Sequence, residues 1–443
     1  MRSPYKILVA ASLVLLLFSL VFGILSILSF LNIPFVAKWL PFQQARPVHV
    51  SSALFWIITA AVAGIMYYNE GSHPLSKKIA DWKIAFVIIW LMGIVAIFTS
   101  YFMGYFGGRE YWEFPPQLNL LLLVAWLLLL AGFYMDVIRK LKDKPVYIWM
   151  WFTGILFFFF TFSEQQLWQI PWFRNSFLKE MTVQWKSNGS MVGAWNQMVY
   201  GTAIYLMVKI SGDESIAHSK KAYFSYFLGL TNLIFNWGHH IYNIPTASWI
   251  RDVAYGITMT EWILVLSIIQ GFRKKLKERE RLRHLLTYKL LIAAEFWVFL
   301  NLLLALLMSI PAINIYTHGT HITVAHAMGT TIGINSMILL ASLTYMLQVD
   351  VNKSNKVDSY FRIGYWVTQT SLMVFWVSLI IAGIVKGIKA VSSPNIAFSD
   401  LMAPVYPVLQ IFMYSGIFVL IGMAILAMLL LISIRRMGKS STN

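Results

Sequence analysis

Histidines inside apolar sequence are the residues of this chain best suited to carry out chemistry. His239 and His240 are adjacent in one apolar stretch, and His326 lies in another. Imidazole is costly to place in hydrocarbon unless it has a partner or binds a metal. Because the chain has no cysteine, thiolate metal sites and covalently attached c-type haem are excluded within it. The pattern therefore predicts a haem or metal centre inside a membrane.

The expected topology places four histidines at a similar depth. His49 begins an apolar stretch at one face, and the pair of adjacent histidines lies near the point where another stretch reaches that face. A third stretch begins at His318, and His326 lies about 12 Å further in at about 1.5 Å per residue of helix. All four side chains should therefore fall in the outer third of the bilayer.

Adjacent histidines on a regular helix point about 100° apart, so both reach one ion only if it lies between them or the helix loosens. Gly238 before the pair and Pro245 after it permit such loosening. Imidazoles without thiolates suit iron, copper or zinc. The alternative is that His239 and His240 are core histidines bonded to the backbone or to Tyr242.

His326 and Met328 are two residues apart, so they project about 200° apart on opposite sides of one helix. Histidine and methionine are both axial haem ligands. One helix would then lie between two haem planes and ligate each of them. The alternative for Met328 is ordinary apolar packing.

The composition places the whole chain in a membrane. Of 443 residues, 58% are hydrophobic and 12% are charged, whereas a soluble domain carries about 25% charged residues. We expect an all-α membrane protein with a single domain over residues 1–443. Apolar runs of about 20 residues predict about twelve transmembrane helices, with the approximate limits 7–31, 50–69, 82–104, 117–138, 147–164, 188–210, 222–243, 252–271, 288–312, 318–347, 361–386 and 404–434.

The formal net charge of +17 is a topology signal and requires no nucleic-acid partner. Most of the 35 Lys and Arg residues fall on the face that carries both termini, including the basic loop 273–284. By the positive-inside rule, both termini are predicted to be cytoplasmic.

Four motifs, in order along the chain, resemble the catalytic subunit of nitric oxide reductases in the haem–copper oxidase superfamily. They are LPFQQARPVH ending at His49, GGREYWEFP around Glu110, GHHIYNIPT around His239 and His240, and NIYTHGTHITVAH ending at His326. The resemblance covers nearly the whole chain. It implies a haem–copper oxidase subunit I-like bundle in a bacterial inner membrane.

The same resemblance implies which residues bind cofactors. His49 would ligate a low-spin haem, and His326 would be the proximal ligand of a high-spin haem. His239 and His240 would hold a non-haem metal, with iron favoured over copper. Glu110 would help to hold a calcium ion between haem propionates.

Two departures from the family pattern stand out. The family has a third metal histidine where this chain reads VQWKSNGSMVGAWNQMVYG, and alignment of the downstream segment Lys209–Gly212 puts Asn188 there. Alignment on Gly201 puts Gly189 there instead. The family's H-x-H becomes His326-Ala327-Met328, so His49 and Met328 would hold the low-spin haem and its potential should rise.

The resemblance implies that the protein takes electrons and protons to reduce nitric oxide to nitrous oxide and water. Glu261, which matches a glutamate beside the non-haem metal, would deliver protons; the alternative is a structural glutamate bonded to neighbouring helices. A histidine-to-asparagine exchange at Asn188 is similar to that of nitric oxide dismutases, which form dinitrogen and oxygen. An asparagine oxygen is tolerable as a ligand of iron.

Three further expectations concern turnover and partners. If the centre holds no second metal, the protein would be a haem electron carrier or gas-binding subunit without turnover. Oxygen reduction is less favoured, because Asn243 stands where oxygen-reducing relatives have a tyrosine. With no haem-c motif and no soluble domain, the short family form implies a separate cytochrome c subunit, or quinol, as electron donor in a denitrification pathway.

Overall fold

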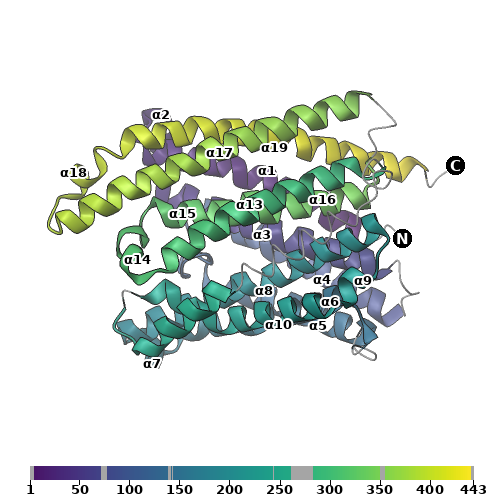
Figure 1. The fold of residues 1–443 in the computed structure, drawn as a ribbon. Coiled ribbons are helices and arrows are strands. Elements are labelled where there is room, and N and C mark those ends of the chain that lie inside the picture. The colour runs from purple at the N-terminus through teal and green to yellow at the C-terminus, as the bar shows by residue number, and fades with distance from the viewer. Residues whose placement is uncertain are drawn as a thin grey trace. The chain divides into compact units, whose positions relative to one another are not determined.

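The protein is built almost entirely from α-helices (Figure 1). The computed structural model describes residues 4–70, 77–137, 141, 143–242, 244–260, 283–349 and 355–440. Within these ranges the chain forms no β-strand, and the one isolated bridge pairs Arg109 with Trp112. The expectation of an all-α membrane protein is confirmed.

Nine helices among the described residues are long and apolar enough to cross a membrane. The segments are Pro4–Phe30, Phe42–Glu70, Ile79–Phe102, Pro116–Val137, Val146–Gln169, Leu285–Ser309, His321–Met346, Lys356–Ser392 and Tyr406–Ile434. Each coincides with a span expected from the sequence. The expected count of twelve is not confirmed, and three of the predicted spans account for the difference.

The first of these, 188–210, lies within α8 (Phe177–Ser211), a helix that buries polar residues such as Gln184 and Gln197. The second, 222–243, is divided between α10 (Lys220–Phe235), of 16 residues, and a 3-10 helix. Sixteen residues are fewer than the about 20 that a straight crossing needs. The third, 252–271, continues beyond the described residues after 260.

The contacts group the helices into two compact units. Unit 1 comprises Met1–Ser12 and Leu54–Leu282, and unit 2 comprises Leu13–Ala53 and Arg283–Asn443. Helices α1 (Pro4–Phe30) and α3 (Phe42–Glu70) are each divided between the two units.

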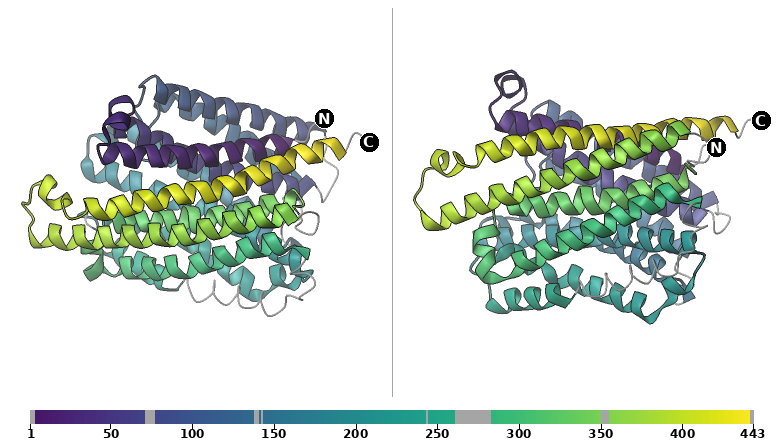
Figure 2. Two further views of the ribbon diagram at one scale, coloured as in Figure 1. Left: turned by 90° about the horizontal axis from the view of Figure 1, so that it is seen from above. Right: turned by 45° about the horizontal axis from the view of Figure 1, so that its top comes forward.

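In unit 1, helix α6 (Val146–Gln165) packs along α8, and α4 (Lys77–Phe102) packs along α5 (Asn119–Val137) (Figures 1 and 2). Large buried tryptophans fill the space between these helices. The Trp90 indole donates to Thr59 Oγ1 at 3.0 Å, and the Trp126 indole donates to the Ile155 carbonyl at 2.8 Å. A buried indole N–H needs such a partner, so these bonds fix the register of neighbouring helices.

In unit 2, the long helices α17 (Asn355–Ser392) and α19 (Tyr406–Ser440) run side by side (Figure 2). Their backbones approach closely at Gly364 and Gly422, because a Cβ on Gly422 would lie 2.9 Å from the Gly364 carbonyl oxygen. Small residues permit this packing in membrane helices, where lipid gives no hydrophobic drive for association.

A π-helix interrupts one transmembrane segment of unit 2. It covers Gly329–Ser336, between α15 (His321–Met328) and α16 (Met337–Met346). The Ser336 hydroxyl donates to the Thr331 carbonyl at 2.8 Å, which spans the five-residue step of the π-turn. Single π-turns occur frequently at functional sites. This one begins directly after Met328.

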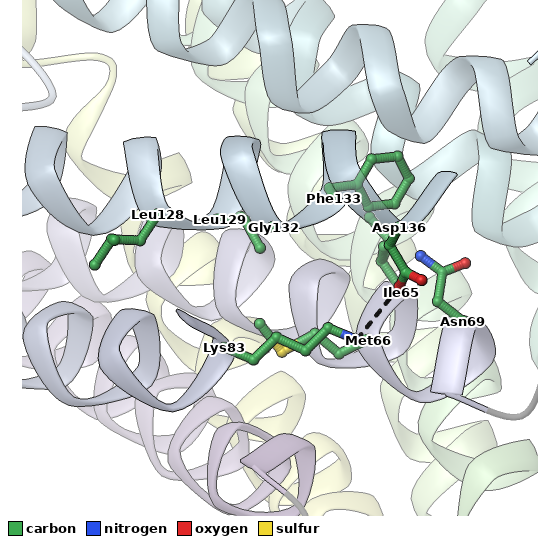
Figure 3. Close-up of a pocket in the computed structure, with 9 residues that line it drawn as sticks. All are labelled: Ile65, Met66, Asn69, Lys83, Leu128, Leu129, Gly132, Phe133 and Asp136. Atoms are coloured by element: carbon green, nitrogen blue, oxygen red, sulfur yellow. Dashed lines mark ion pairs between the residues drawn. The ribbon is translucent and has the colours of Figure 1, made fainter. Parts of the chain in front are cut away.

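A buried ion cluster joins the ends of three helices in unit 1. The Nζ of Lys83 in α4 lies 3.6 Å from Asp136 Oδ2 in α5 and 3.9 Å from Glu70 Oε1 at the end of α3. Beside it is a cavity of about 10 Å³, room for about one water molecule. Figure 3 shows Lys83 pointing at Asp136, with Asn69 adjacent and otherwise apolar walls. The cluster therefore holds three helix ends together.

Candidate haem and metal site

His49 has the geometry of a haem ligand in unit 2. Its Nδ1 lies 2.7 Å from the main-chain carbonyl oxygen of Ser19. A carbonyl only accepts, so Nδ1 carries the hydrogen and Nε2 keeps its lone pair for a metal. Metal-binding histidines are commonly oriented in this way.

Gly23 provides the space for that imidazole. A Cβ on Gly23 would lie 3.0 Å from both Cε1 and Nδ1 of His49, closer than side chains normally pack. The ring therefore rests against bare backbone of α1, and the Ser19 carbonyl lies one turn away on the same helix. This cradle fits a ligating imidazole that is held from behind.

His326 lies on α15 in unit 2, at a partly buried position of the same helix that carries Met328. The buried Nδ1 of His326 has no well-formed hydrogen bond, although it faces the main-chain carbonyl of Asn301 in α13 (Leu285–Ser309). The donor set fits a haem at this histidine. Ligation by Met328 stays a prediction.

His239 and His240 lie in unit 1 on a 3-10 helix, η4 (Asn236–Ile241), and not on a regular α-helix. The expected local loosening is therefore present. The two ring centroids are 4.1 Å apart, with 42° between the ring planes. Two imidazoles this close fit a shared metal ion.

Both imidazoles of this pair are held by neighbouring side chains. His239 Nδ1 lies 3.0 Å from Asn236 Oδ1, an oxygen that also accepts from the Thr258 hydroxyl. His240 stacks on Trp185 of α8, with ring centroids 5.6 Å apart and 15° between planes. The Tyr242 hydroxyl donates to the Arg251 carbonyl at 3.5 Å.

Gly189, on the same face of α8 as Trp185, lies directly against the histidine pair. A Cβ on Gly189 would lie 3.2 Å from His240 Cδ2 and 3.0 Å from Trp237 Cβ. The contacts of α8 thus bring position 189 to the histidines. They support the alignment that puts Gly189 at the third metal-histidine position.

Asn188 is turned toward a different segment. Its Nδ2 donates to the Glu110 carbonyl at 3.4 Å, and Gln184, one turn earlier, donates to the same oxygen at 3.2 Å. The Asn188 side chain is buried, and its Oδ1 has no hydrogen-bond partner within the described part of the chain. Ligation of a metal by Asn188 remains a prediction that these contacts do not favour.

Glu110 lies in a tightly turned loop over residues 107–115. A Cβ on Gly108 would lie 1.8 Å from the Trp112 carbonyl oxygen, so a side chain cannot be placed there. The Arg109 guanidinium donates to Glu180 at 2.6 Å and lies 3.9 Å over the Trp168 ring. These contacts hold the loop against Glu180 in α8 and against Trp168 in the segment that precedes α8. The calcium at Glu110 stays a prediction.

Among the described residues there is no group of three or more His, Cys, Asp or Glu side chains placed to hold one metal ion. The described residues would therefore supply the non-haem metal with the two imidazoles of His239 and His240. Glu261, the expected proton donor, lies outside the described residues.

The supporting residues Ser19, Gly23, Trp185 and Asn236 did not emerge from the sequence. Asn236 could have been identified from the sequence, because it lies three residues before His239, and three residues make one turn of a 3-10 helix. The others depend on which helices pack together. No local pattern gives that information.

Comparison with known proteins shows the family to which the chain belongs. A family model for cytochrome c and quinol oxidase polypeptide I matches residues 4–418. The chain is 22% identical over 414 residues to a nitric oxide reductase subunit of Stutzerimonas stutzeri, covering 85% of this chain and 82% of that protein. It is 21% identical over 434 residues to cytochrome c oxidase subunit 1 of Rhodobacter capsulatus, covering 93% and 80%.

The fold also matches a solved structure. A heme-copper terminal oxidase dimer superposes with a TM-score of 0.72 at 15% identity, covering 98% of this chain and 84% of that one. The match supports the subunit I-like bundle expected from the sequence.

Proposed function

Because the chain belongs to the cytochrome c and quinol oxidase polypeptide I family, we propose that it reduces nitric oxide to nitrous oxide in a membrane. Members of this family are haem–copper oxidoreductases that bind haems and a non-haem metal. The observation that carries the proposal is the close pair His239 and His240, each held by a neighbouring side chain.

His49 with Met328 would hold one haem, His326 a second, and the histidine pair a non-haem iron or copper. When bound, these groups supply the redox chemistry, in which two nitric oxide molecules take two electrons and two protons to give nitrous oxide and water. Two metals that hold both reactants work by proximity and by stabilising charge on the coupled product.

Residues of the chain would orient the two imidazoles and leave space for a small substrate beside them. Asn236 fixes the His239 ring so that Nε2 faces away from the hydrogen bond, and Trp185 fixes the plane of His240. Gly189 adds no side chain next to the pair. A metal with few protein ligands keeps open positions, which a small gas can occupy.

Reduction is favoured over dismutation by the contacts of Asn188. The resemblance to nitric oxide dismutases rests on an asparagine at the metal, whereas this asparagine donates to the Glu110 carbonyl. Its amide helps to hold the loop over residues 107–115. The dismutase alternative therefore loses its main support.

The proposal includes a cytochrome c subunit or quinol as electron donor and Glu261 as proton donor. It also places both termini on the cytoplasmic side of a bacterial inner membrane. Related proteins named above are subunits of cytochrome c oxidases and of a nitric oxide reductase.

The test uses the full chain purified in detergent. Haem and metal are counted per chain, and doubly labelled nitric oxide is supplied anaerobically with a reductant while the gases are followed by mass spectrometry. We expect two haems, one non-haem metal and labelled nitrous oxide. His239→Ala should lose the metal and the nitrous oxide but keep both haems.

Other products would overturn the proposal in distinct ways. Labelled dinitrogen with labelled oxygen would show a dismutase. Two haems without a non-haem metal and without gas turnover would show an electron carrier or gas-binding subunit. Consumption of oxygen but not of nitric oxide would show an oxidase.

A further inference from the structure

Asn301 of α13 contacts the His326 segment at two places. Its main-chain carbonyl faces His326 Nδ1. Its side-chain Nδ2 donates to Thr330 Oγ1 at 2.7 Å, and the Thr330 hydroxyl donates to the His326 carbonyl at 3.1 Å. One asparagine therefore reaches the imidazole from its main chain and the peptide of the same histidine from its side chain.

The other end of the Asn301 amide is buried without a partner. Asn301 is 2% exposed, and its Oδ1 accepts no hydrogen bond from any residue that the structure describes. A Cβ on Gly329 would lie 2.3 Å from this oxygen and 3.1 Å from Trp376 Nε1, which also lacks a partner. An orphaned acceptor and an orphaned donor thus lie beside the same glycine, directly after Met328.

An isolated buried donor or acceptor is destabilising, so such groups normally have a role or a bound water. One water molecule between them would satisfy both Trp376 Nε1 and Asn301 Oδ1. Gly329 has no side chain to fill the space beside these two atoms. The π-turn that begins at Gly329 presents this bare backbone toward α13 and α17.

We propose that Asn301 is the positioning residue of His326, locked by Thr330 on one side and Trp376 on the other. This inference rests on the proposed function, in which His326 ligates a haem through Nε2. A fixed Asn301 holds its carbonyl toward Nδ1, which selects the tautomer with hydrogen on Nδ1 and orients the ring.

The experiment measures the iron–histidine stretching band of the reduced high-spin haem by resonance Raman spectroscopy, in full-length protein with haem bound. Asn301→Leu keeps the main-chain carbonyl but removes the amide that donates to Thr330 and lies near Trp376. We expect its band to shift and broaden, because the carbonyl and the ring lose their fixed orientation. Thr330→Val removes one hydroxyl at constant volume and should shift the band in the same direction by less.

Asn314→Leu is the matched control. Asn314 is also buried in unit 2, and its Nδ2 donates to the Met308 carbonyl at 2.9 Å. Its substitution should leave the band in place. If Asn301→Leu fails to fold, Thr330→Val alone decides the outcome.

An unchanged band in Thr330→Val and Asn301→Leu would overturn this inference and leave the proposed function standing. An equal shift in Asn314→Leu would also overturn it, because any buried asparagine would then have the same effect. If the unmodified protein gives no iron–histidine band, or His326→Ala retains it, both the inference and the proposed function fail.

Discussion

His49 donates its Nδ1 hydrogen to the main-chain carbonyl of Ser19 over 2.7 Å, so its Nε2 is the nitrogen available to a metal. Because the acceptor is backbone, no substitution of the Ser19 side chain removes this bond. The arrangement depends instead on how closely α1 and the imidazole approach. Gly23 determines that distance.

Gly23→Val should displace the His49 imidazole. Its Cβ would lie 3.0 Å from two ring atoms, and the two methyl groups would extend further toward the ring. We expect loss of the low-spin haem, with haem content falling from two to one per chain and the His326 haem retained. Pyridine haemochrome analysis with low-temperature absorption spectra measures both quantities.

Gly256→Val is the control for this substitution, because no atom lies within 4 Å of a Cβ at Gly256. Its haem content should equal that of the parent protein. Retention of both haems in Gly23→Val would show that His49 does not hold haem in the described orientation.

Histidine substitutions distinguish the two alignments of α8. Gly189→His introduces an imidazole next to His240, and its Cβ alone requires Trp237 and His240 to move by a few tenths of an ångström. We expect the non-haem metal to survive chelator treatment better than in the parent protein, by about tenfold or more. Asn188→His should not improve retention, because it removes a donor from the Glu110 carbonyl.

Gly193→His controls for the introduction of an imidazole into α8. Gly193 lies one turn further along the same face, against Leu233. Metal content after dialysis against a chelator should be unchanged in this variant. Improved retention in Asn188→His but not in Gly189→His would reverse the assignment of the two positions.

The sequence was sufficient to predict nine membrane helices of the described chain and to single out the residues proposed to bind cofactors. Nine predicted spans are present because an apolar run of about 20 residues has few folded alternatives. The histidines could be singled out because an imidazole in hydrocarbon is costly unless it has a partner or binds a metal. Neither argument depends on which helices are neighbours.

What the sequence could not show depends on packing. The alignment left open whether Asn188 or Gly189 takes the position of the third metal histidine. Adjacent residues on a helix point about 100° apart, so the two alignments place different side chains at the metal. The contacts of Gly189 with His240 and of Asn188 with Glu110, which favour one alternative, come from helix packing and not from the local sequence. The π-turn after Met328 also has no local signature, since its Thr, Gly and Asn residues are compatible with many conformations.

His318 should make the stability of unit 2 depend on pH. It lies in the turn after α14 (Pro311–Thr317), and burial lowers its pKa below the ordinary value of 6.5. The unfolded chain then binds more protons between the two pKa values, so stability is complete above pH 6.5 and is lost as pH falls below it. His318→Gln should reduce the fall in thermal midpoint between about pH 7.5 and about pH 5.5. An identical fall in the variant and the parent would contradict the assignment.

Lys83→Met should destabilise unit 1. It leaves Asp136 and Glu70 facing a buried apolar side chain without the ammonium that lies 3.6 Å and 3.9 Å from them. Breaking a tight buried ion pair costs about 3–5 kcal/mol, and we expect about 2 kcal/mol because both distances exceed hydrogen-bond length. Lys209→Met is the control, since its pair with Glu214 is exposed and should contribute less than about 1 kcal/mol. Thermal denaturation in detergent compares the two, and equal midpoints would show that the Lys83 cluster does not hold the helix ends together.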